Sequence, residues 1–577
     1  MKAKTVQEGV TFTFDKGIAV DIDVKPGIKE VTICYDLQIE TEEKSFPDVE
    51  SLVITSYVNK IEILNTLFPN VKAVQSYSLN FISGPYLVYK HRTLLNTFCT
   101  DKEIDLKYVV TIENKAFYKC KSLKIKNSTD VRECKEDAFT DSALMEQPFI
   151  HGVKMLGNIV IAVDETAETV VLPDEDEPIQ TFADNVNLSR VKKLVIHNED
   201  SLSYSKLKQV PPYVVLDSNK VEYIDDLLHL LHLTKNNTYI YQLKLTDKVT
   251  DFKEIDGVIY DRDVQILIAS PIGKEFIQIP ETVQVIANHA FECCNIKLIT
   301  LPDSIKEIKS YAFYDCQNLE HVNLGNNLVC IGNYAFAQCE KLKNVELPPS
   351  IKVLRKGMFA SSGLESIKLN EGLQVIKTSV FFDTDLTDIH IPASVKRIEF
   401  EAFNTKIKNI SFETYFDDIF TVFANQMWSN NLNVNDNTVK LKCNNRIAYV
   451  PRYVIPAAYD EVNKLLKEYF SCRISETCEL WPYAYSTAGR DNTAIIEYEV
   501  SASNTAKKYI KQNAKRIIFR LIEEGDEEKT VKFLKLGLVS KTVLETLVPK
   551  ASELEQMTVQ AYLLELLRGE CNHDFSL

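Results

Sequence analysis

The chain has 577 residues, of which 45% are hydrophobic, 10% aromatic and 25% charged, and its formal net charge is −15. This composition is ordinary for a soluble protein, and no apolar run approaches the ~18 residues of a transmembrane helix. The acidic balance argues against a nucleic-acid-binding protein. A chain this long holds more than one ordinary core, unless it is a solenoid that grows by stacking.

The first residues contain no secretion signal, because residues 1–4 are followed by polar side chains rather than by an apolar stretch. The thirteen cysteines are an odd number, which makes a disulfide framework improbable. We therefore expect a reducing, cytoplasmic location and no membrane attachment.

Two strand-like runs open the chain, at 10–14 and 31–35, where β-branched and aromatic residues predominate. The terminal coil of a solenoid has only one neighbour to cover its apolar face. Residues 1–45 are therefore expected to form an N-terminal cap.

A degenerate repeat follows the predicted cap. Phe46 and Phe68 each precede a proline and lie 22 residues apart, and Phe117 and Phe139 are also 22 residues apart. We interpret residues 46–150 as degenerate leucine-rich repeats.

The repeat is interrupted over 151–275. Residues 156–162 and 257–263 open similar strand patterns, and each predicts a β-hairpin inserted before a standard coil. We expect the polar residues 261–263 to form the tip of the second hairpin. Residues 225–233 fit either a short helix or a buried strand.

A regular repeat occupies residues 276–412. Segment 319–324 reads L-E-H-V-N-L, the L-x-x-V-x-L pattern of a leucine-rich repeat, whose apolar residues point inward from a parallel sheet. A marker phenylalanine recurs every 22 or 23 residues, at Phe291, Phe313, Phe336, Phe359, Phe381 and Phe403. A fixed period in this range is typical of a solenoid.

After residue 412 the repeat stops. Residues 413–500 are expected to form a closing α/β segment, with helical spacing at 459–470. Residues 501–577 predict a small helical bundle, with a helix over 506–524 ended by Gly525, and shorter helices around 529–536, 542–547 and 558–567. The predicted fold class is α+β: a leucine-rich repeat β-solenoid of 22–23-residue coils followed by a small α-helical C-terminal domain.

The repeat consensus, P-x-S-V/I-x-x-I-x-x-x-A-F-x-x-C-x-x-L, resembles the BspA-like leucine-rich repeat of bacterial proteins. The stretches 257–263 and 267–271 resemble segments often found in that family. This resemblance implies a binding protein without catalysis, and many members are secreted adhesins. The helices around 533–538 and 561–564 loosely resemble the ankyrin-like tails of some bacterial members.

The exposed positions of the predicted sheet should lie in one row, flanked by a second set of polar residues. A mixed polar row suits a protein or peptide ligand better than polyanionic nucleic acid, and the alternative is a solvated face without a fixed partner. The row consists of Thr300, Asn323, Glu346, Lys368, His390 and Ser411, and its flank consists of Leu298, His321, Asn344, Ser366, Asp388 and Asn409.

Several cysteines occupy one position of the repeat, three residues after the marker phenylalanine. A position that accepts Cys, Ser or Thr indicates a small packing site rather than a ligand or a bridge. The set comprises Cys120, Cys294, Cys316 and Cys339, with Ser142, Ser362, Thr384 and Lys406 in other copies.

Two groups of cysteines outside this position raise the possibility of catalysis. The sequence Cys571-Asn572-His573-Asp574 contains protease residue types, but catalytic partners usually come from separate parts of a fold, which favours a simple tail. Cys472 and Cys478 lack an accompanying base or nucleophile signature, so we interpret them as inert thiols.

Three further candidate sites, for a metal or for an acidic partner, each have a simpler structural interpretation. His229 and His232 have i, i+3 spacing but no third ligand, so core histidines are favoured. The acidic stretch 174–177 lacks the pattern of a calcium loop and is interpreted as a solvated turn. The helix over 506–521 is basic, through Lys507, Lys508, Lys511, Lys515, Arg516 and Arg520, and an ordinary charged face is favoured over an acidic partner or RNA.

The sequence contains no P-loop, H-E-x-x-H or Gly-rich dinucleotide motif. We therefore expect no enzyme, cofactor or metal, but a protein-binding scaffold for a protein or peptide partner, with no nucleic acid and no membrane. The alternatives are an exported surface adhesin of the BspA type, and an enzyme module in residues 413–577 carried by a repeat targeting domain.

Overall fold

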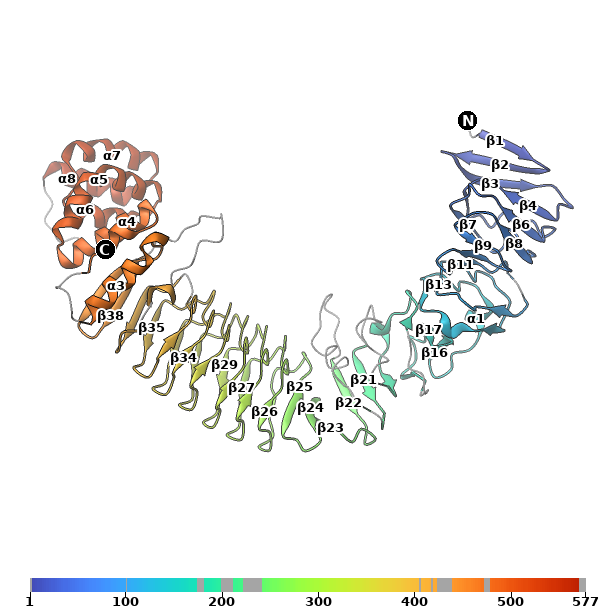
Figure 1. The fold of residues 1–577 in the computed structure, drawn as a ribbon, viewed down its shortest axis with the longest axis horizontal. Helices are drawn as coiled ribbons and strands as arrows, with labels where there is room; N and C mark the ends of the chain where they lie inside the picture. Colours follow the sequence, from blue (N-terminus) through green and yellow to red (C-terminus); the bar gives the residue numbers. More distant parts are fainter. Residues whose placement is uncertain are drawn as a thin grey trace. The chain divides into compact units, whose positions relative to one another are not determined.

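In the computed structural model of the chain, the structure describes residues 3–99, 101–173, 181–198, 211–219, 221, 241–403, 406–416, 419–422, 438–471 and 478–569. The chain forms two compact units, Met1–Asp263 with Ala269–Gly273, and Val264–Ile268 with Lys274–Leu577 (Figure 1). Several candidate residues of the sequence lie outside the described ranges: the acidic stretch 174–177, His229, His232, Cys472 and the 571–574 tail.

The first unit opens with antiparallel strands and then changes to parallel coils. Strand β1 pairs with β2 and β2 with β3, whereas β3 pairs in parallel with β5, and β5 with β7. A second parallel sheet, β4-β6-β8, forms another side of the same coils. These strands are β1 (Ala3–Gln7), β2 (Val10–Asp15), β3 (Ile18–Val24), β4 (Glu30–Ile33), β5 (Leu37–Ile39), β6 (Ser51–Ile54), β7 (Ile61–Ile63) and β8 (Ala73–Ser76).

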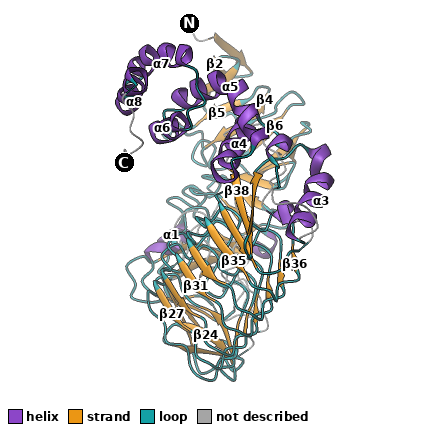
Figure 2. Cartoon of the chain, turned by 90° about the vertical axis from the view of Figure 1, so that its left-hand side faces the viewer, coloured by secondary structure: helices purple, strands orange, loops and turns teal. Residues whose placement is uncertain are grey.

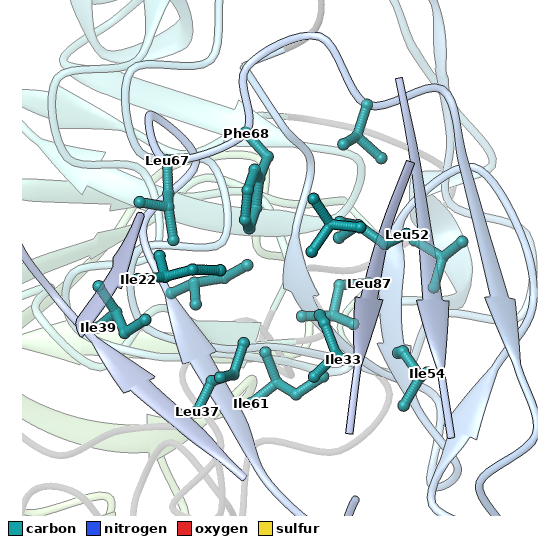
Figure 3. Packing of buried hydrophobic residues seen from close by; sticks show 14 of the residues in the cluster. Ile22, Ile33, Leu37, Ile39, Leu52, Ile54, Ile61, Leu67, Phe68 and Leu87 are labelled. Atoms are coloured by element: carbon teal, nitrogen blue, oxygen red, sulfur yellow. The ribbon is translucent and has the colours of Figure 1, made fainter. Parts of the chain in front are cut away.

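The core of these coils lies between the two sheets. Figure 3 shows Leu52 and Ile54 of β6, Leu37 of β5 and the ring of Phe68 within one cluster of buried side chains. Phe68 is fully buried. Because one coil cannot bury its own apolar face, each layer of this core depends on the next coil.

The rest of the first unit contains shorter, mostly parallel strands. They are β9 (Phe81–Ile82), β10 (Leu87–Tyr89), β11 (Thr93–Asn96), β12 (Ile104–Asp105), β13 (Thr111–Ile112), β14 (Ile125–Lys126), β15 (Glu133–Cys134), β16 (Val153–Leu156), β17 (Ile159–Val163), β18 (Val170–Val171), β19 (Thr181–Phe182), β20 (Leu194–Ile196), β21 (Tyr213–Leu216), β22 (Gln242–Leu245), β23 (Phe252–Ile255) and β24 (Val258–Asp261), with one short helix, α1 (Ala143–Glu146).

Hairpins form at both predicted places: β16 is joined to β17, and β24 is joined to its sheet neighbour β25 (Ile266–Ala269) by a turn at residues 262–263, where the tip was expected. A further hairpin, which was not predicted, precedes the second one. β23 and β24 pair from Phe252 opposite Asp261 to Ile255 opposite Val258, which places Asp256 and Gly257 at the turn. Both turn residues have positive φ, 55° and 82°, as a two-residue Asp-Gly turn requires. The Asp-Gly pair was the sequence signal for this additional hairpin.

The second unit carries the regular coils, whose two sheets face different sides (Figure 2). One side has β27 (Leu298–Thr300), β29 (His321–Asn323), β31 (Asn344–Glu346), β33 (Ser366–Lys368), β35 (Asp388–Ile391) and β37 (Asn409–Phe412). The other has β25 (Ile266–Ala269), β26 (Val285–Ile286), β28 (Glu307–Ile308), β30 (Cys330–Ile331), β32 (Val353–Leu354), β34 (Val375–Ile376) and β36 (Arg397–Ile398).

The marker phenylalanines form one continuous stack between these sheets. Successive ring centroids from Phe291 to Phe403 are 4.8, 5.0, 5.9, 6.1 and 5.6 Å apart, and no interplanar angle exceeds 14°. All six rings are buried. The stack keeps successive coils in register, because each ring contacts the same ring one coil away.

Each coil bends sharply on both sides of its marker phenylalanine. Residues two positions before and two positions after the ring have φ between 51° and 61°, in the left-handed region. Non-glycine residues there cost roughly 1–2 kcal/mol each. They are His289, Tyr311, Tyr334, Ser379 and Glu401 before the ring and Cys293, Asp315, Gln338, Ser361 and Asp383 after it.

Gly357 is the one glycine among these left-handed positions. A Cβ atom built on it would lie 2.1 Å from Cε1 of Tyr334, the equivalent residue of the preceding coil. Tyr334 itself stacks on Tyr311 at 5.2 Å, and Tyr311 on His289 at 5.0 Å. The absent side chain therefore leaves room for the end of a second ring stack.

The C-terminal part of the second unit adds two strands and a helical region. The strands are β38 (Thr438–Cys443) and β39 (Arg446–Pro451), and the helices are α3 (Tyr459–Phe470), α4 (Thr487–Ser501), α5 (Asn504–Glu523), α6 (Glu527–Lys535), α7 (Lys541–Glu553) and α8 (Met557–Arg568). Coils of about 22 residues followed by a helical region confirm the predicted fold class. None of the described helices has the length and hydropathy needed to cross a bilayer.

We predict that Phe336→Ala destabilises its own and the adjacent coils. The ring is fully buried between Phe313 and Phe359, so its removal should cost ~3–5 kcal/mol. Amide hydrogen exchange by mass spectrometry should become about 10²- to 10⁴-fold faster in these coils, because coils contact only their neighbours.

Phe382→Ala is the matched control, because this ring is 46% exposed beside the buried Phe381. Its effect should stay within about 0.5 kcal/mol. Equal effects of the two substitutions would contradict the role given to the stack.

Candidate functional site

The candidate site is the outward face of the strands from β27 to β37. In each strand from β27 to β35 the central residue points inward, and the residues on either side of it are exposed. This alternation follows from the pleat of a β-strand. In β37 the corresponding residues are half-buried.

The structure brings all six predicted residues into one row. Parallel pairing sets Thr300 beside Asn323. Glu346 pairs in the same way with Lys368, and His390 with Ser411. Strand spacing of about 4.8 Å makes this row about 25 Å long. Its ligand-binding role remains a prediction.

Polar contacts within the row are weak or local. The Lys368 and Glu346 side chains lie 4.0 Å apart but are 83% and 82% exposed, so their ion pair contributes at most ~1 kcal/mol. His390 Nδ1 lies 3.0 Å from Ser411 Oγ, and its Nε2 lies 3.9 Å from Glu413. These groups therefore remain largely available to a partner.

The face continues for one strand beyond the predicted row. β38 pairs in parallel with β37, which places Lys442 beside Ser411 and Lys440 beside Asn409. Sequence reasoning missed both lysines. The alternation in T-V-K-L-K-C at 438–443 was the available signal, because its apolar residues are buried and its lysines are not.

Helix α4 closes the face at its C-terminal end. It contacts β38 and β39, and Thr493 Oγ1 lies 2.8 Å from Thr438 Oγ1. On the outward side of β39, burial, followed by the charges of Glu497 and Glu499 on α4, raises the pKa of Tyr449. The outward face is therefore open along β27–β37, and α4 covers it only in part at β38 and β39, where Lys442 stays exposed.

Helix α3 covers the apolar interior at the same end of the coils. The ring of Phe470 packs edge-on against Phe412 at 5.2 Å, and Tyr469 donates a hydrogen bond of 3.0 Å to the Ile447 carbonyl. Arg446 donates to the Tyr469 carbonyl at 2.7 Å. A capped last coil needs no further repeat to cover its core.

The repeats match the family described as "BspA type Leucine rich repeat region" in six copies, over residues 95–198, 273–384 and 331–445. The chain is a BspA-type leucine-rich repeat protein. The matched ranges end before the helices α3–α8, and nothing found supports the ankyrin-like resemblance of the tail. No curated protein matches significantly.

Solved structures with similar repeats include the pneumococcal vaccine antigen PcpA, at 14% identity over 72% of this chain and 94% of that one, with a TM-score of 0.31. A leucine-rich repeat protein of Eubacterium ventriosum has 16% identity over 70% and 95%, with a TM-score of 0.29. A leucine-rich cell surface protein of Faecalibacterium prausnitzii has 15% identity over 71% and 89%, with a TM-score of 0.21. Scores this low carry no argument about function.

The cysteine position of the BspA-type repeat is a packing site. Cys316 donates to the Phe291 carbonyl at 2.9 Å, and Cys339 to that of Phe313 at 3.2 Å. These two bonds reach the preceding coil, whereas Ser362 donates to the Phe359 carbonyl of its own coil at 2.7 Å. Burial raises the pKa of the Cys316 and Cys339 thiols well above their usual range. These buried thiols therefore link each coil to the one before it.

No metal-binding cluster occurs in the part of the chain that the structure describes. No group of three or more His, Cys, Asp or Glu side chains is arranged to hold a metal there. Cys478 is buried, and burial, with the charge of Glu497 as a second cause, raises its pKa to about 12. A thiol this basic stays protonated at neutral pH and is a poor nucleophile.

The basic helix α5 uses part of its charge within the fold. Arg516 forms two hydrogen bonds, of 2.6 and 2.7 Å, with Asp491 of α4, whose side chain is fully buried. Arg520 bonds Asn492 at 2.9 Å and Glu524 at 2.6 Å. The two arginines thus join α4 to α5. Lys508, Lys511 and Lys515 are exposed.

We predict that Cys478 resists alkylation in the folded protein. With a pKa of about 12, only ~10⁻⁴ of the thiol is ionised at pH 8, against roughly a quarter for an ordinary cysteine. Iodoacetamide labelling followed by peptide mass spectrometry should modify Cys478 only after unfolding in guanidinium. The half-exposed Cys330 serves as the labelled control.

Rapid native labelling of Cys478, together with an activity lost in Cys478→Ser, would contradict this prediction and favour an enzyme module in the 413–577 region.

Proposed function

We propose that this BspA-type protein binds a protein or peptide partner through the outward face of β27–β37, without catalysis. The observation that carries the proposal is the aligned row from Thr300 to Ser411, exposed over its first five strands and held on a stacked core. A rigid scaffold fixes the spacing of its surface groups before binding, which lowers the entropic cost of association.

The chemistry of the row suits a polypeptide. Glu346, Lys368 and Asp388 carry opposite charges on neighbouring strands, and Asn323 and His390 add amide and imidazole groups. Charges of both signs fix the register of a protein partner by complementarity and repel wrong partners. A polyanion would meet the carboxylates of this face as well as its cations.

The compartment of this binding is a separate question. An exported surface protein has more support than the cytoplasmic scaffold, because the repeats are of the BspA type and many members of that family are secreted adhesins. We therefore propose surface binding, with the cytoplasmic scaffold as the second candidate.

We expect native cells to expose this protein to externally added protease. Intact cells treated with protease should lose the full-length band on an immunoblot, while a cytosolic marker enzyme persists. Recovery of the uncut protein only in the cytosolic fraction would instead favour the scaffold.

Removing the row should abolish partner capture. We predict that the quadruple variant Asn323→Ala, Glu346→Ala, Lys368→Ala and His390→Ala no longer retains the proteins that the wild-type chain captures after mild cross-linking. The four side chains are exposed, so stability should change by less than about 0.5 kcal/mol each.

A control variant with four exposed side chains of the first unit, Lys25→Ala, Lys90→Ala, Glu103→Ala and Asp137→Ala, should capture the same set as wild type. Retention of every partner by the quadruple row variant, with both variants folded by circular dichroism, would refute the proposed face.

A further inference from the structure

The sheet on the other side of the coils, β32-β34-β36, concentrates positive charge. Register pairs Val353 with Val375 and Val375 with Arg397, so flanking residues of the three strands lie side by side. The residues outside the core are six cations and one acid: Lys352, Arg355, Lys356, Lys377, Lys396 and Arg397 with Glu399. Six minus one gives +5 on three strands of a chain whose net charge is −15.

Most of this charge is unbalanced within the fold. Lys377 and Arg397 share Glu399, at 2.8 and 3.1 Å. Lys352, Arg355 and Lys396 are exposed and form no ion pair with any described residue. Nζ of Lys356 lies 6.0 Å from the centre of the Tyr334 ring, a weak cation–π contact.

The cations are close enough to act together. Two strand steps of about 4.8 Å separate Lys352 from Lys396, and three residues of about 3.3 Å separate Lys352 from Arg355. Both separations are about 10 Å, close to the screening length at physiological salt. The group therefore produces one positive potential, which attracts an anionic ligand and steers its encounter.

An apolar stripe runs between the cations. Val353 and Val375 are half-buried and directly paired, and Cys330 occupies the corresponding, half-buried position of β30. Phe400, at the β36 end, is 39% exposed. A ligand that covers this face must therefore provide apolar groups as well as negative charges.

We propose that the basic face, defined by the six cations around the Val353–Val375 stripe, docks an extended acidic peptide segment of a partner protein, in which pairs of Asp or Glu residues alternate with pairs of apolar residues. An extended peptide directs successive side chains to opposite sides, so a repeat of two acidic and two apolar residues places both kinds on the side that faces the sheet, about 6.6 Å apart and within the width of three strands. A nucleic-acid backbone offers phosphates but nothing for the valines, and aromatic platforms for its bases are scarce on this face.

This surface is separate from the row on β27–β37 and uses none of its residues. Failure of either proposal therefore leaves the other standing, because the two sets of substitutions lie on different sheets. It also differs from the basic part of α5, whose two arginines join α4 to α5.

The test uses the full chain and a fluorescein-labelled synthetic peptide with the repeat Glu-Glu-Leu-Leu, and binding is followed by fluorescence anisotropy. We expect saturable binding that weakens as salt is raised through about 0.15 M. Lys352→Glu, Arg355→Glu and Lys396→Glu combined should weaken binding at least about tenfold. Lys25→Glu, Lys90→Glu and Lys244→Glu combined make the same change in net charge on exposed residues of the first unit and should leave affinity within about twofold.

Three further results would overturn the proposal. Equal weakening of peptide binding by both triple variants would show that the affinity depends only on the net charge of the protein. Equal affinity for a poly-Glu peptide lacking leucine would remove the apolar stripe from recognition. Binding of a single-stranded oligonucleotide or heparin fragment, but not of the peptide, would assign the face to a different polyanion. Circular dichroism melting of both triple variants identifies a folding defect, and Lys396→Gln alone then serves as a milder substitution.

Discussion

The stacking of one phenylalanine on the next is the contact on which the second unit depends. No single coil buries its own apolar face, so the coils are stable only as neighbours. Ring centroids 4.8–6.1 Å apart, with nearly parallel planes, set each coil over the last with little freedom to rotate or slip. Both candidate surfaces follow from this constraint, because side chains at equivalent positions then form straight rows.

The periodic features of the molecule are those that the sequence predicts well. Phe291 and Phe313 mark the coil without any knowledge of three-dimensional contacts, since the period repeats locally. From the period and the alternation of a strand, the row that contains Glu346 and Lys368 follows directly. The same reasoning extends to β38, where Lys440 and Lys442 alternate with buried residues, although the interruption after residue 412 concealed that strand.

The features that escaped prediction depend on long-range or non-periodic contacts. Asp491 of helix α4 is fully buried, although an aspartate in a sequence usually indicates an exposed position. Arg516, the ion-pair partner of Asp491, lies 25 residues away in the sequence. The left-handed residues around each phenylalanine include Tyr311 and Glu401, which give no sequence signal for that conformation. The basic face requires the register of three coils at once, because its cations occupy different positions in each.

The closure of the outward sheet by α4 has a consequence for how such a protein evolves. The last coil is capped by α3 and partly covered by α4, so the C-terminal end of the face is fixed by segments outside the repeat. Duplication of one internal coil would therefore lengthen the face by about one strand spacing, 4.8 Å, without altering that boundary. The area available to a partner can thus change in discrete steps of one coil, about 22 residues. Each added coil has core residues that already fit those of its neighbours.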